Sequence, residues 1–338
     1  MKDFADYSML AHNTFGIDAK CRRFIEFASV GELKEALVSI GGACGSMLII
    51  GEGSNLLLTR DFDGVVLHSA IKGREWSVGG DGTVLLRCGS GETWDDIVGF
   101  CVDKGWHGAE NLSLIPGEVG ASAVQNIGAY GAEAKDIIYK VEAVEVATGR
   151  EVEFSNADCC YAYRDSKFKR EWKNRYVITY VTYALSLTFS PDLDYGNIRA
   201  SLLSQGIEHP TAHQLRQTII DIRRAKLPDP HVLGNAGSFF MNPVVDAAVY
   251  RDLSKRYPDM PHYVVSADKV KIPAGWMIDQ CGWKGKSLGR AGVHDRQALV
   301  LVNRGGATGS DVVALYRRII GDVKAKFGID IHPEVNVI

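Results

Sequence analysis

A segment rich in glycine and alanine constrains the fold of this chain more than any other feature. The run Ile115-Pro-Gly-Glu-Val-Gly-Ala-Ser-Ala-Val-Gln-Asn-Ile-Gly-Ala-Tyr-Gly131 holds four glycines and three alanines, and Glu118 is its only charged residue. Glycine loses more backbone entropy on folding than any other residue, so this density indicates that another group needs bare backbone there. A large flat or phosphorylated ligand, held against main-chain N–H groups, suits such a segment.

Length and charge narrow the class of protein. A chain of 338 residues exceeds what one hydrophobic core usually holds, which predicts two or three domains. The composition is 46% hydrophobic and 23% charged with a net charge of −3, so no basic surface for nucleic acid is expected. No apolar run approaches the roughly 20 residues that span a bilayer, and the acidic start Met1–Tyr7 lacks the apolar region of a signal peptide. We therefore expect a cytoplasmic protein without membrane insertion.

The cysteines and histidines predict neither disulfides nor a metal site. The seven cysteines are scattered and show no Cys-x-x-Cys pair, as is typical of buried free thiols in a reducing compartment. His209 and His213 are four residues apart, but the intervening Glu of a zinc peptidase is missing and Pro210 lies between them. A helix start explains this pair better than a metal ion does.

The first half of the chain alternates between strand and helix patterns. Strands are expected at 23–28, 47–50, 56–58, 65–67 and 83–88, and helices at 31–39 and 90–104. A hairpin is predicted from 141–146 and 150–154, followed by a strand at 176–187. The loop Gly51–Asn55 is therefore a strand–loop–strand connection.

The second half favours helices. They are expected from Thr211 to about Arg224 and at 244–256, 273–281 and 310–326, the last ending at Gly328. The prolines of Leu227–Pro230 make a natural domain boundary. Strands are expected at 299–302 and 329–338, the latter interrupted by Pro333.

The turn Gly51-Glu-Gly-Ser-Asn55 is a second glycine segment. A Rossmann fingerprint needs a third glycine at the position of Leu56 and a following helix, and neither is expected here. A short turn can still bind a diphosphate through consecutive N–H groups, the Ser54 hydroxyl and the Asn55 amide. Taken alone, the turn also fits a tight connection, but the later glycine segment could hold another part of the same ligand.

The residues of both glycine segments, together with motifs along the whole chain, are similar to those of one family. This family is the UDP-N-acetylenolpyruvoylglucosamine reductases (MurB), type I branch. The motifs that carry the resemblance occur in the family's order: Asn13–Phe15, Gly51–Asn55, Ile115–Ala121, Gln125–Gly131, Tyr163–Ser166, Gly237–Phe240, Ala274–Asp279 and His332–Glu334. Each is weak alone, and the combination is specific.

The resemblance implies a fold and a cofactor. It implies an α+β or α/β flavoprotein with the vanillyl-alcohol-oxidase-like FAD-binding fold of two subdomains, plus a C-terminal substrate-binding domain. The expected divisions are 1–70 with the strand 329–338, 71–227, and 228–328. FAD is expected to be non-covalent, because the Gly51–Asn55 turn offers neither His nor Cys. The matching FAD-binding positions are Gly51, Gly53, Ser54, Asn55, Ile115, Pro116, Gly117, Gly120, Ala121, Gln125, Asn126, Ile127 and Gly128.

The implied reaction is the NADPH-dependent reduction of an enolpyruvyl ether, UDP-N-acetylglucosamine enolpyruvate, to a lactyl ether. Hydride passes from reduced flavin N5 to the terminal carbon, and charge builds at the α-carbon. Matching positions make Arg164 the residue that grips the carboxylate, Ser238 the proton donor and Glu334 an acid that assists. Without the resemblance, Arg164 would be interpreted as a surface arginine beside Asp165. Ser238 would be interpreted as a serine in a turn, and Glu334 as a carboxylate of the C-terminal tail.

The resemblance also implies contacts to the UDP-sugar. The matching positions are Tyr130, Tyr195, Lys226, Asn242, Lys284 and Gln297, with the lysines suited to the diphosphate. His294 and Asp295 are read as local support, while Ser113 and Glu118 receive no role.

Two other functions stay open from the residues. One is a flavin oxidase of the same fold acting on a hydroxy acid or sugar alcohol, and the other is a nucleotide-sugar binding protein without catalysis. For the reductase, a monomer without nucleic-acid partners is expected.

Overall fold

The computed structural model describes residues 1–41 and 46–338, which form two compact units. Unit 1 comprises Met1–Tyr7, Cys21–Glu52 and Asp63–Ala225, and unit 2 comprises Ser8–Lys20, Gly53–Phe62 and Lys226–Ile338. The division into three domains expected from the sequence stays a prediction.

A four-stranded sheet with the order β1-β2-β5-β3 begins unit 1. Its strands are β1 (Lys2–Ser8), β2 (Lys20–Phe27), β5 (Phe62–Ser69) and β3 (Ser46–Ile50). Helix α1 (Val30–Ile40) begins at Ser29, whose side chain accepts a hydrogen bond from the N–H of Glu32. Leu33 and Ala36 of this helix are buried against β2 and β5, so the apolar face of α1 closes a small core.

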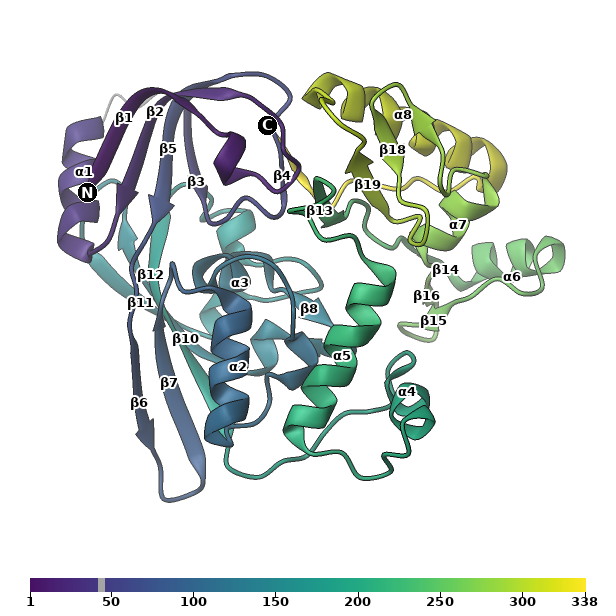
Figure 1. Ribbon diagram of the computed structural model, residues 1–338, viewed down its shortest axis with the longest axis horizontal. Helices are drawn as coiled ribbons and strands as arrows, with labels where there is room; N and C mark the ends of the chain where they lie inside the picture. The colour runs from purple at the N-terminus through teal and green to yellow at the C-terminus, as the bar shows by residue number, and fades with distance from the viewer. Residues whose placement is uncertain (42–45) are drawn as a thin grey trace. The chain divides into compact units, whose positions relative to one another are not determined.

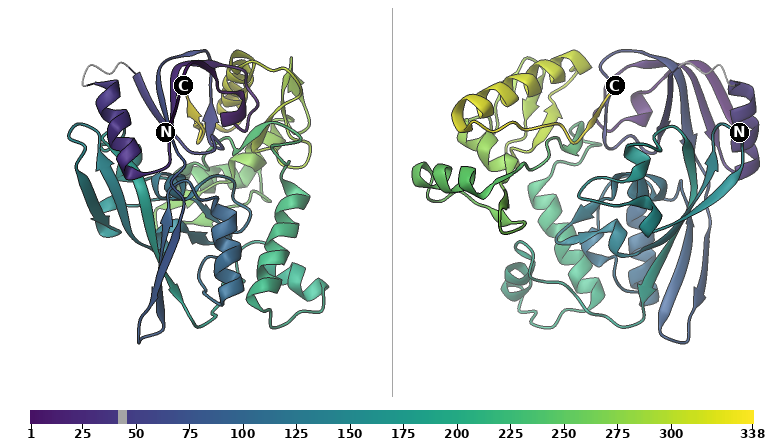
Figure 2. Two further views of the ribbon diagram at one scale, coloured as in Figure 1. Left: turned by 60° about the vertical axis from the view of Figure 1, so that its left-hand side comes forward. Right: turned by 180° about the vertical axis from the view of Figure 1, so that it is seen from behind.

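A five-stranded sheet with the order β11-β10-β12-β7-β6 forms the rest of the framework of unit 1. Its strands are β11 (Glu151–Ser155), β10 (Ile138–Glu145), β12 (Tyr176–Ser186), β7 (Thr83–Gly89) and β6 (Arg74–Val78). Helix α2 (Trp94–Lys104) lies along one face of this sheet in Figure 1 and in both views of Figure 2. Gly105, in the left-handed conformation, ends α2.

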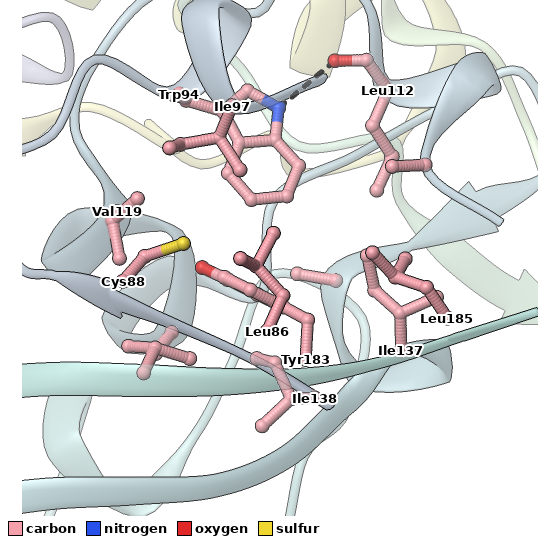
Figure 3. Packing of buried hydrophobic residues seen from close by; sticks show 14 of the residues in the cluster. Leu86, Cys88, Trp94, Ile97, Leu112, Val119, Ile137, Ile138, Tyr183 and Leu185 are labelled. Atoms are coloured by element: carbon pink, nitrogen blue, oxygen red, sulfur yellow. Dashed lines mark hydrogen bonds between the residues drawn. The ribbon is translucent and has the colours of Figure 1, made fainter. Parts of the chain in front are cut away.

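The main core of unit 1 lies between this sheet and its helices. Trp94 of α2 is 1% exposed and donates from Nε1 to the carbonyl of Leu112, as Figure 3 shows. Its ring packs edge-on against Tyr183 of β12, whose hydroxyl lies 2.9 Å from Ser122 Oγ. Ser122 belongs to α3 (Val119–Gln125). This buried contact fixes α3, and with it the glycine-rich segment, to the sheet.

The glycine-rich segment therefore contains a short helix that its composition did not predict. Alanine is the best helix former, and the three small residues Gly120, Ala121 and Ala123 allow α3 to pack closely. Two-residue strands β8 (Gly128–Ala129) and β9 (Ala132–Glu133) follow. Helices α4 (Ile198–Ser204) and α5 (Ala212–Lys226) come later in the chain.

Unit 2 contains a four-stranded sheet with the order β13-β19-β18-β17. The strands are β13 (Asn235–Ser238), β19 (Val300–Asn303), β18 (Ala291–Val293) and β17 (Ser287–Leu288). Helices α7 (Ala274–Gln280) and α8 (Gly309–Phe327) lie beside β18 and β19 (Figure 1). A separate three-stranded sheet pairs β14 (Val244–Asp246) and β15 (Tyr263–Val264) with β16 (Lys269–Lys271), next to α6 (Ala247–Arg256).

Several sequence predictions need correction. The helix expected at 244–256 begins only at Ala247, because Val244–Asp246 pairs as β14. The helix expected from Ser90 begins at Trp94. The C-terminal strand is reduced to β20 (Asn336–Val337), which pairs in parallel with β4 (Leu56–Leu57). Pro333 makes only an isolated bridge to Phe240, since proline has no N–H for a ladder.

The thiols are mostly buried, as expected. Cys21, Cys88, Cys101 and Cys159 are buried free cysteines. Cys160 is exposed and Cys281 is partly exposed, both of which the prediction missed, and Cys44 lies outside the described residues. Among the helices of residues 1–41 and 46–338, none has both the length and the apolarity needed to cross a bilayer.

Candidate functional site

Close packing explains a glycine of the first glycine turn, and the same turn holds a side-chain amide without a hydrogen-bond partner among the described residues. Gly53 has φ 75°, and a Cβ there would lie 2.0 Å from the carbonyl of His12, so no other residue fits. The strands on either side are β3 and β4, as predicted. Asn55 follows, and its buried Nδ2 has no hydrogen-bond partner in the described part of the chain. Because a buried amide N–H without an acceptor is costly, this atom fits an oxygen-rich ligand such as a diphosphate.

Protein neighbours also explain the glycines of the second segment. A Cβ on Gly120 would lie 2.9 Å from the Cβ of Ser90, and one on Gly128 would lie 2.8 Å from Nη1 of Arg164. Gly117 has φ 117°, a conformation that other residues avoid. The inference that bare backbone there serves a ligand is therefore incomplete, since close packing of the chain on itself requires these glycines as well.

The guanidinium of Arg164 rests on the carbonyl groups of this segment. Its Nη2 donates to the carbonyl of Gly128 and its Nη1 lies 3.4 Å from the carbonyl of Asn126. Arg164 has φ 55°, an uncommon backbone conformation for a residue with a side chain. Neighbouring Asp165 pairs with Arg170 at 3.1 Å. The structure thus brings a predicted catalytic residue together with the predicted cofactor segment.

Asn126 connects the same two segments through its side chain. It is 0% exposed with φ 46°. Its Nδ2 donates to the carbonyl of Ala162 at 2.8 Å and its Oδ1 accepts from the N–H of Lys135 at 3.0 Å. The amide is therefore engaged in holding the loop that carries Arg164, a role that the sequence did not indicate.

Tyr130 and Tyr195, both expected at the UDP-sugar, come from segments that the structure brings together. Nδ2 of Asn111 donates to the carbonyls of Tyr130 and Asp192 at 2.9 and 3.0 Å. A Cβ on Gly131 would lie 3.2 Å from the Cβ of Tyr195. Burial raises the pKa of the Tyr130 hydroxyl, so it stays a hydrogen-bond donor at neutral pH.

Arg223 was missed by the sequence reasoning. It lies half-buried on α5 and donates from Nε to the carbonyl of Leu114 at 3.2 Å. Burial lowers its pKa, and its charge interacts with Tyr130 and with Arg164. In the sequence it reads as one more polar residue of an amphipathic helix, so no signal singled it out. It adds a second cation to this part of unit 1, where an anionic ligand would be favoured.

Ser238 ends β13 in unit 2, and buried residues hold it in place. Phe239 and Phe240, which follow it, are 0% and 1% exposed. Gly237 has φ 68°, and its N–H donates to Asn235 Oδ1 at 2.9 Å. The hydroxyl of Thr14 donates to the Asn235 carbonyl at 2.7 Å. The early Asn13–Phe15 motif therefore supports the serine strand.

Glu334 lies in the segment beside this strand end. Its N–H donates to the carbonyl of Phe239 at 2.8 Å, and the N–H of Met241 donates to the carbonyl of His332 at 3.0 Å. The tail His332–Glu334 thus runs along the residues that follow Ser238. Two of the three predicted catalytic residues are brought together in unit 2, and Arg164 belongs to unit 1.

The remaining predicted substrate residues lie in unit 2, where some make hydrogen bonds or an ion pair. Oδ1 of Asn242 accepts from the N–H of Ala274 at 2.9 Å and so caps α7. Nζ of Lys284 lies 3.5 Å from Oδ2 of Asp279. Lys226 is exposed at the end of α5. Oε1 of Gln297 accepts from the N–H of Leu299 at 3.4 Å.

His294, read as local support, is 5% exposed, and its Nδ1 has no hydrogen-bond partner in the described residues. Burial lowers its pKa, with Arg296 adding to the effect, so the ring is neutral at physiological pH. Within residues 1–41 and 46–338, no group of three or more His, Cys, Asp or Glu side chains is placed to hold a metal ion.

Comparison with known proteins decides the family. The model described as "UDP-N-acetylenolpyruvoylglucosamine reductase, C-terminal domain" matches residues 229–338, and the model described as "FAD binding domain" matches residues 22–155. The UDP-N-acetylenolpyruvoylglucosamine reductase of Bacteroides fragilis is 55% identical over 332 residues, covering 98% of this chain and 99% of the relative. This chain belongs to the UDP-N-acetylenolpyruvoylglucosamine reductase family. The family member from Burkholderia ambifaria is 48% identical over 331 residues, covering 97% of this chain and 95% of the relative.

The fold agrees with this family. The crystal structure of MurB from Thermus caldophilus matches with a TM-score of 0.68 at 21% identity, covering 99% of this chain and 98% of that one. The predicted family, the vanillyl-alcohol-oxidase-like fold and FAD as cofactor are thus confirmed. Nδ2 of Asn55, which has no partner among residues 1–41 and 46–338, and the cationic Arg164 fit such an anionic cofactor and substrate.

Proposed function

We propose that this chain reduces UDP-N-acetylglucosamine enolpyruvate to UDP-N-acetylmuramate with electrons from NADPH. The observation that carries the proposal is the 55% identity, along 98% of the chain, to a reductase of that name. The reaction adds a hydride and a proton across one C=C bond and consumes one NADPH. Bound FAD would supply the chemistry that carries hydride from NADPH to the substrate.

We assign the cofactor to the two glycine segments. Asn55 and Ser54, with the backbone N–H groups of Gly51 and Gly53, would hold the diphosphate. The segment from Ile115 to Gly128 would line the rest of the cofactor. The unpaired Nδ2 of Asn55 supports the first assignment.

Arg164 is proposed to bind the carboxylate of the enolpyruvyl group. A guanidinium keeps its charge at all relevant pH values and can donate two parallel hydrogen bonds to a carboxylate. Its position is fixed by the Asn126 and Gly128 carbonyls. It would stabilise the negative charge that builds on the substrate when hydride arrives. The half-buried Arg223 and the Tyr130 hydroxyl would add a cation and a donor for the nucleotide part.

Ser238 is proposed to give its proton to the α-carbon. A serine hydroxyl is a weak acid, but the developing carbanion is a strong base, so the transfer is feasible if water or a lysine then reprotonates the alkoxide. Glu334 would assist as a second acid from the neighbouring segment. The buried Phe239 and Phe240 support this role because they fix the orientation of the serine strand.

The decisive experiment separates the two half-reactions. Flavin absorbance bands, bleaching by NADPH without oxygen, and reoxidation by UDP-N-acetylglucosamine enolpyruvate are expected. Turnover with O₂ and no NADPH consumption would indicate the oxidase, and a colourless chain would indicate a binding protein.

Ser238→Ala should leave reduction by NADPH near the wild-type rate. It should slow reoxidation by the enolpyruvyl substrate by about 10²- to 10⁴-fold, the usual contribution of a positioned acid. Ser310→Ala, an exposed position on α8, is the matched control and should change neither rate. Equal losses in both half-reactions of Ser238→Ala would contradict the role given to Ser238.

We further propose that the enzyme works in the cytoplasm as a monomer. The free cysteines Cys21, Cys88, Cys101 and Cys159 support a reducing compartment. Light scattering of the holoenzyme tests the monomeric state.

A further inference from the structure

A buried histidine joins two acidic residues beside the first glycine turn. His68 on β5 pairs with Ile50, the last residue of β3, and Gly51 follows directly. Nε2 of His68 lies 3.2 Å from Glu118 Oε1, and Nδ1 lies 3.1 Å from Glu26 Oε2. The side chains of His68, Glu118 and Glu26 are 12%, 15% and 18% exposed. None of these three side chains has been given a catalytic or substrate-binding role.

Glu118 lies where the two cofactor segments meet. A Cβ on Gly51 would be 3.0 Å from Glu118 Oε2, the carboxylate oxygen that does not face His68. Glu118 also immediately precedes α3, and the N–H of the next residue, Val119, donates to the carbonyl of Glu92 at 2.9 Å. Glu118 therefore lies against Gly51 of the first glycine turn, directly precedes α3 within the second segment, and places its carboxylate 3.2 Å from His68 of β5.

A second contact joins the same parts of unit 1. Ser69, the residue after His68, places its Oγ 2.6 Å from Ser90 Oγ. The carbonyl of Ser90 accepts from the N–H of Gly120 at 2.8 Å. The end of β5 is thus held to the start of α3 at two successive residues, and of these two contacts only that of His68 involves a titratable ring.

The charges around His68 favour the imidazolium. Burial acts to lower its pKa, but Glu118 and Glu26 outweigh burial and the pKa is raised. Nζ of Lys2 on β1 lies 2.6 Å from Oε1 of Glu26. The ring centroids of Phe24 on β2 and His68 are 6.1 Å apart. A protonated imidazole donates from both nitrogens, whereas the neutral ring donates from one and turns a lone pair toward the other carboxylate.

We propose that His68 and Glu118 are positioning residues for the cofactor. The imidazolium bridge holds Gly51 and the segment that begins at Ile115 at the spacing that FAD requires. This inference rests on the proposed function, in which both segments hold FAD. It gives FAD affinity a pH dependence, because the raised pKa means that the bridge is intact at low pH and is lost as pH rises through the pKa of His68.

The test is FAD affinity of His68→Gln, Glu118→Gln and the double variant, measured by flavin fluorescence at about pH 6 and about pH 9. Wild-type affinity should fall between the two pH values. At about pH 6 each single variant should bind FAD roughly 10- to 100-fold more weakly, as expected for loss of a hydrogen bond to a charged group. The double variant should lose little more than either single variant, because both remove the same contact.

A matched control is the exposed pair of His213 and Asp103, 3.0 Å apart with side chains 65% and 74% exposed. His213→Gln should leave FAD affinity and its pH dependence unchanged. Thermal unfolding of each apo-protein provides the readout for folding alone.

The outcomes separate the inference from the function on which it rests. Wild-type affinity and pH dependence in both single variants would overturn the inference alone, as would a change in apo-protein stability without a change in FAD affinity. Absence of FAD binding by the wild-type chain would overturn the proposed function, and this inference with it. If His68→Gln does not fold, Glu118→Gln carries the test, because its amide keeps the size of the side chain.

Discussion

The position of Arg164, proposed to bind the substrate carboxylate, depends on an uncharged residue. Nδ2 of Asn126 holds the carbonyl of Ala162, two residues before Arg164, and the Asn126 carbonyl receives the guanidinium itself. Both Asn126 and Arg164 have positive φ. Such conformations persist only where surrounding contacts enforce them. The buried amide of Asn126 is one such contact.

Asn126→Ala should therefore disturb Arg164 while leaving the proposed catalytic side chains in place. It leaves the Lys135 N–H without its acceptor and the Ala162 carbonyl with only the Asp165 N–H as donor, which costs about 1–3 kcal/mol of unfolding free energy. We expect reoxidation by the enolpyruvyl substrate to slow, while reduction by NADPH changes less. Urea unfolding and stopped-flow absorbance measure these two effects.

Asn126→Gly separates backbone strain from the amide bonds, because glycine adopts a positive φ at no steric cost. It should resemble Asn126→Ala in its kinetics and lose less stability. Wild-type kinetics in Asn126→Gly would show that the amide does not position Arg164.

Single residues were predictable where a motif names them and unpredictable where contacts join distant parts of the chain. Arg164, Ser238 and Glu334 were proposed from the family resemblance, and the structure gives each an ordered setting. Asn126 and its acceptor Ala162 are 36 residues apart in the sequence. Arg223 and its acceptor Leu114 are 109 residues apart. No local pattern in a single sequence encodes such pairs.

At the scale of elements, two glycines of α8 should respond oppositely to the same change. Gly321 is exposed in the helix interior, and a Cβ there would meet nothing within 4 Å. Gly321→Ala should raise the unfolding free energy by about 0.5–1 kcal/mol, the difference in helix propensity. Gly309, at the start of α8, would place a Cβ 2.0 Å from the carbonyl of Leu58.

Gly309→Ala must therefore push α8 away from the end of β4, and we expect a loss of about 1–3 kcal/mol, typical of overpacking. Denaturant unfolding of the two variants side by side makes each the control of the other. A gain in stability for Gly309→Ala would contradict the close approach of α8 to Leu58.

Elements were predictable in proportion to their length and their caps. The prediction for α8 holds because the helix is periodic, starts at the capping box of Thr308 and Asp311, and ends at Gly328. Strands β14, β15 and β16 have two or three residues each, too few to show a period of two. Val244–Asp246 therefore read as the first turn of the following helix.

At the scale of the whole molecule, the proposed function gives both glycine segments to FAD, although the reaction also uses NADPH. The chain contains no Gly-x-Gly-x-x-Gly run, and both glycine segments are given to FAD. NADPH therefore has no fingerprint site of its own. We expect it to use the residues that bind the UDP-sugar, at a different time from that substrate.

This sharing predicts ping-pong kinetics. NADPH should reduce the flavin and NADP⁺ should leave before the enolpyruvyl substrate binds, because both ligands need the same cations for their phosphates. Initial rates at several fixed NADPH concentrations should give parallel double-reciprocal lines. NADP⁺ should also be released in a rapid single turnover without the second substrate. Intersecting lines, or a complex that holds both ligands at once, would require a separate NADPH site.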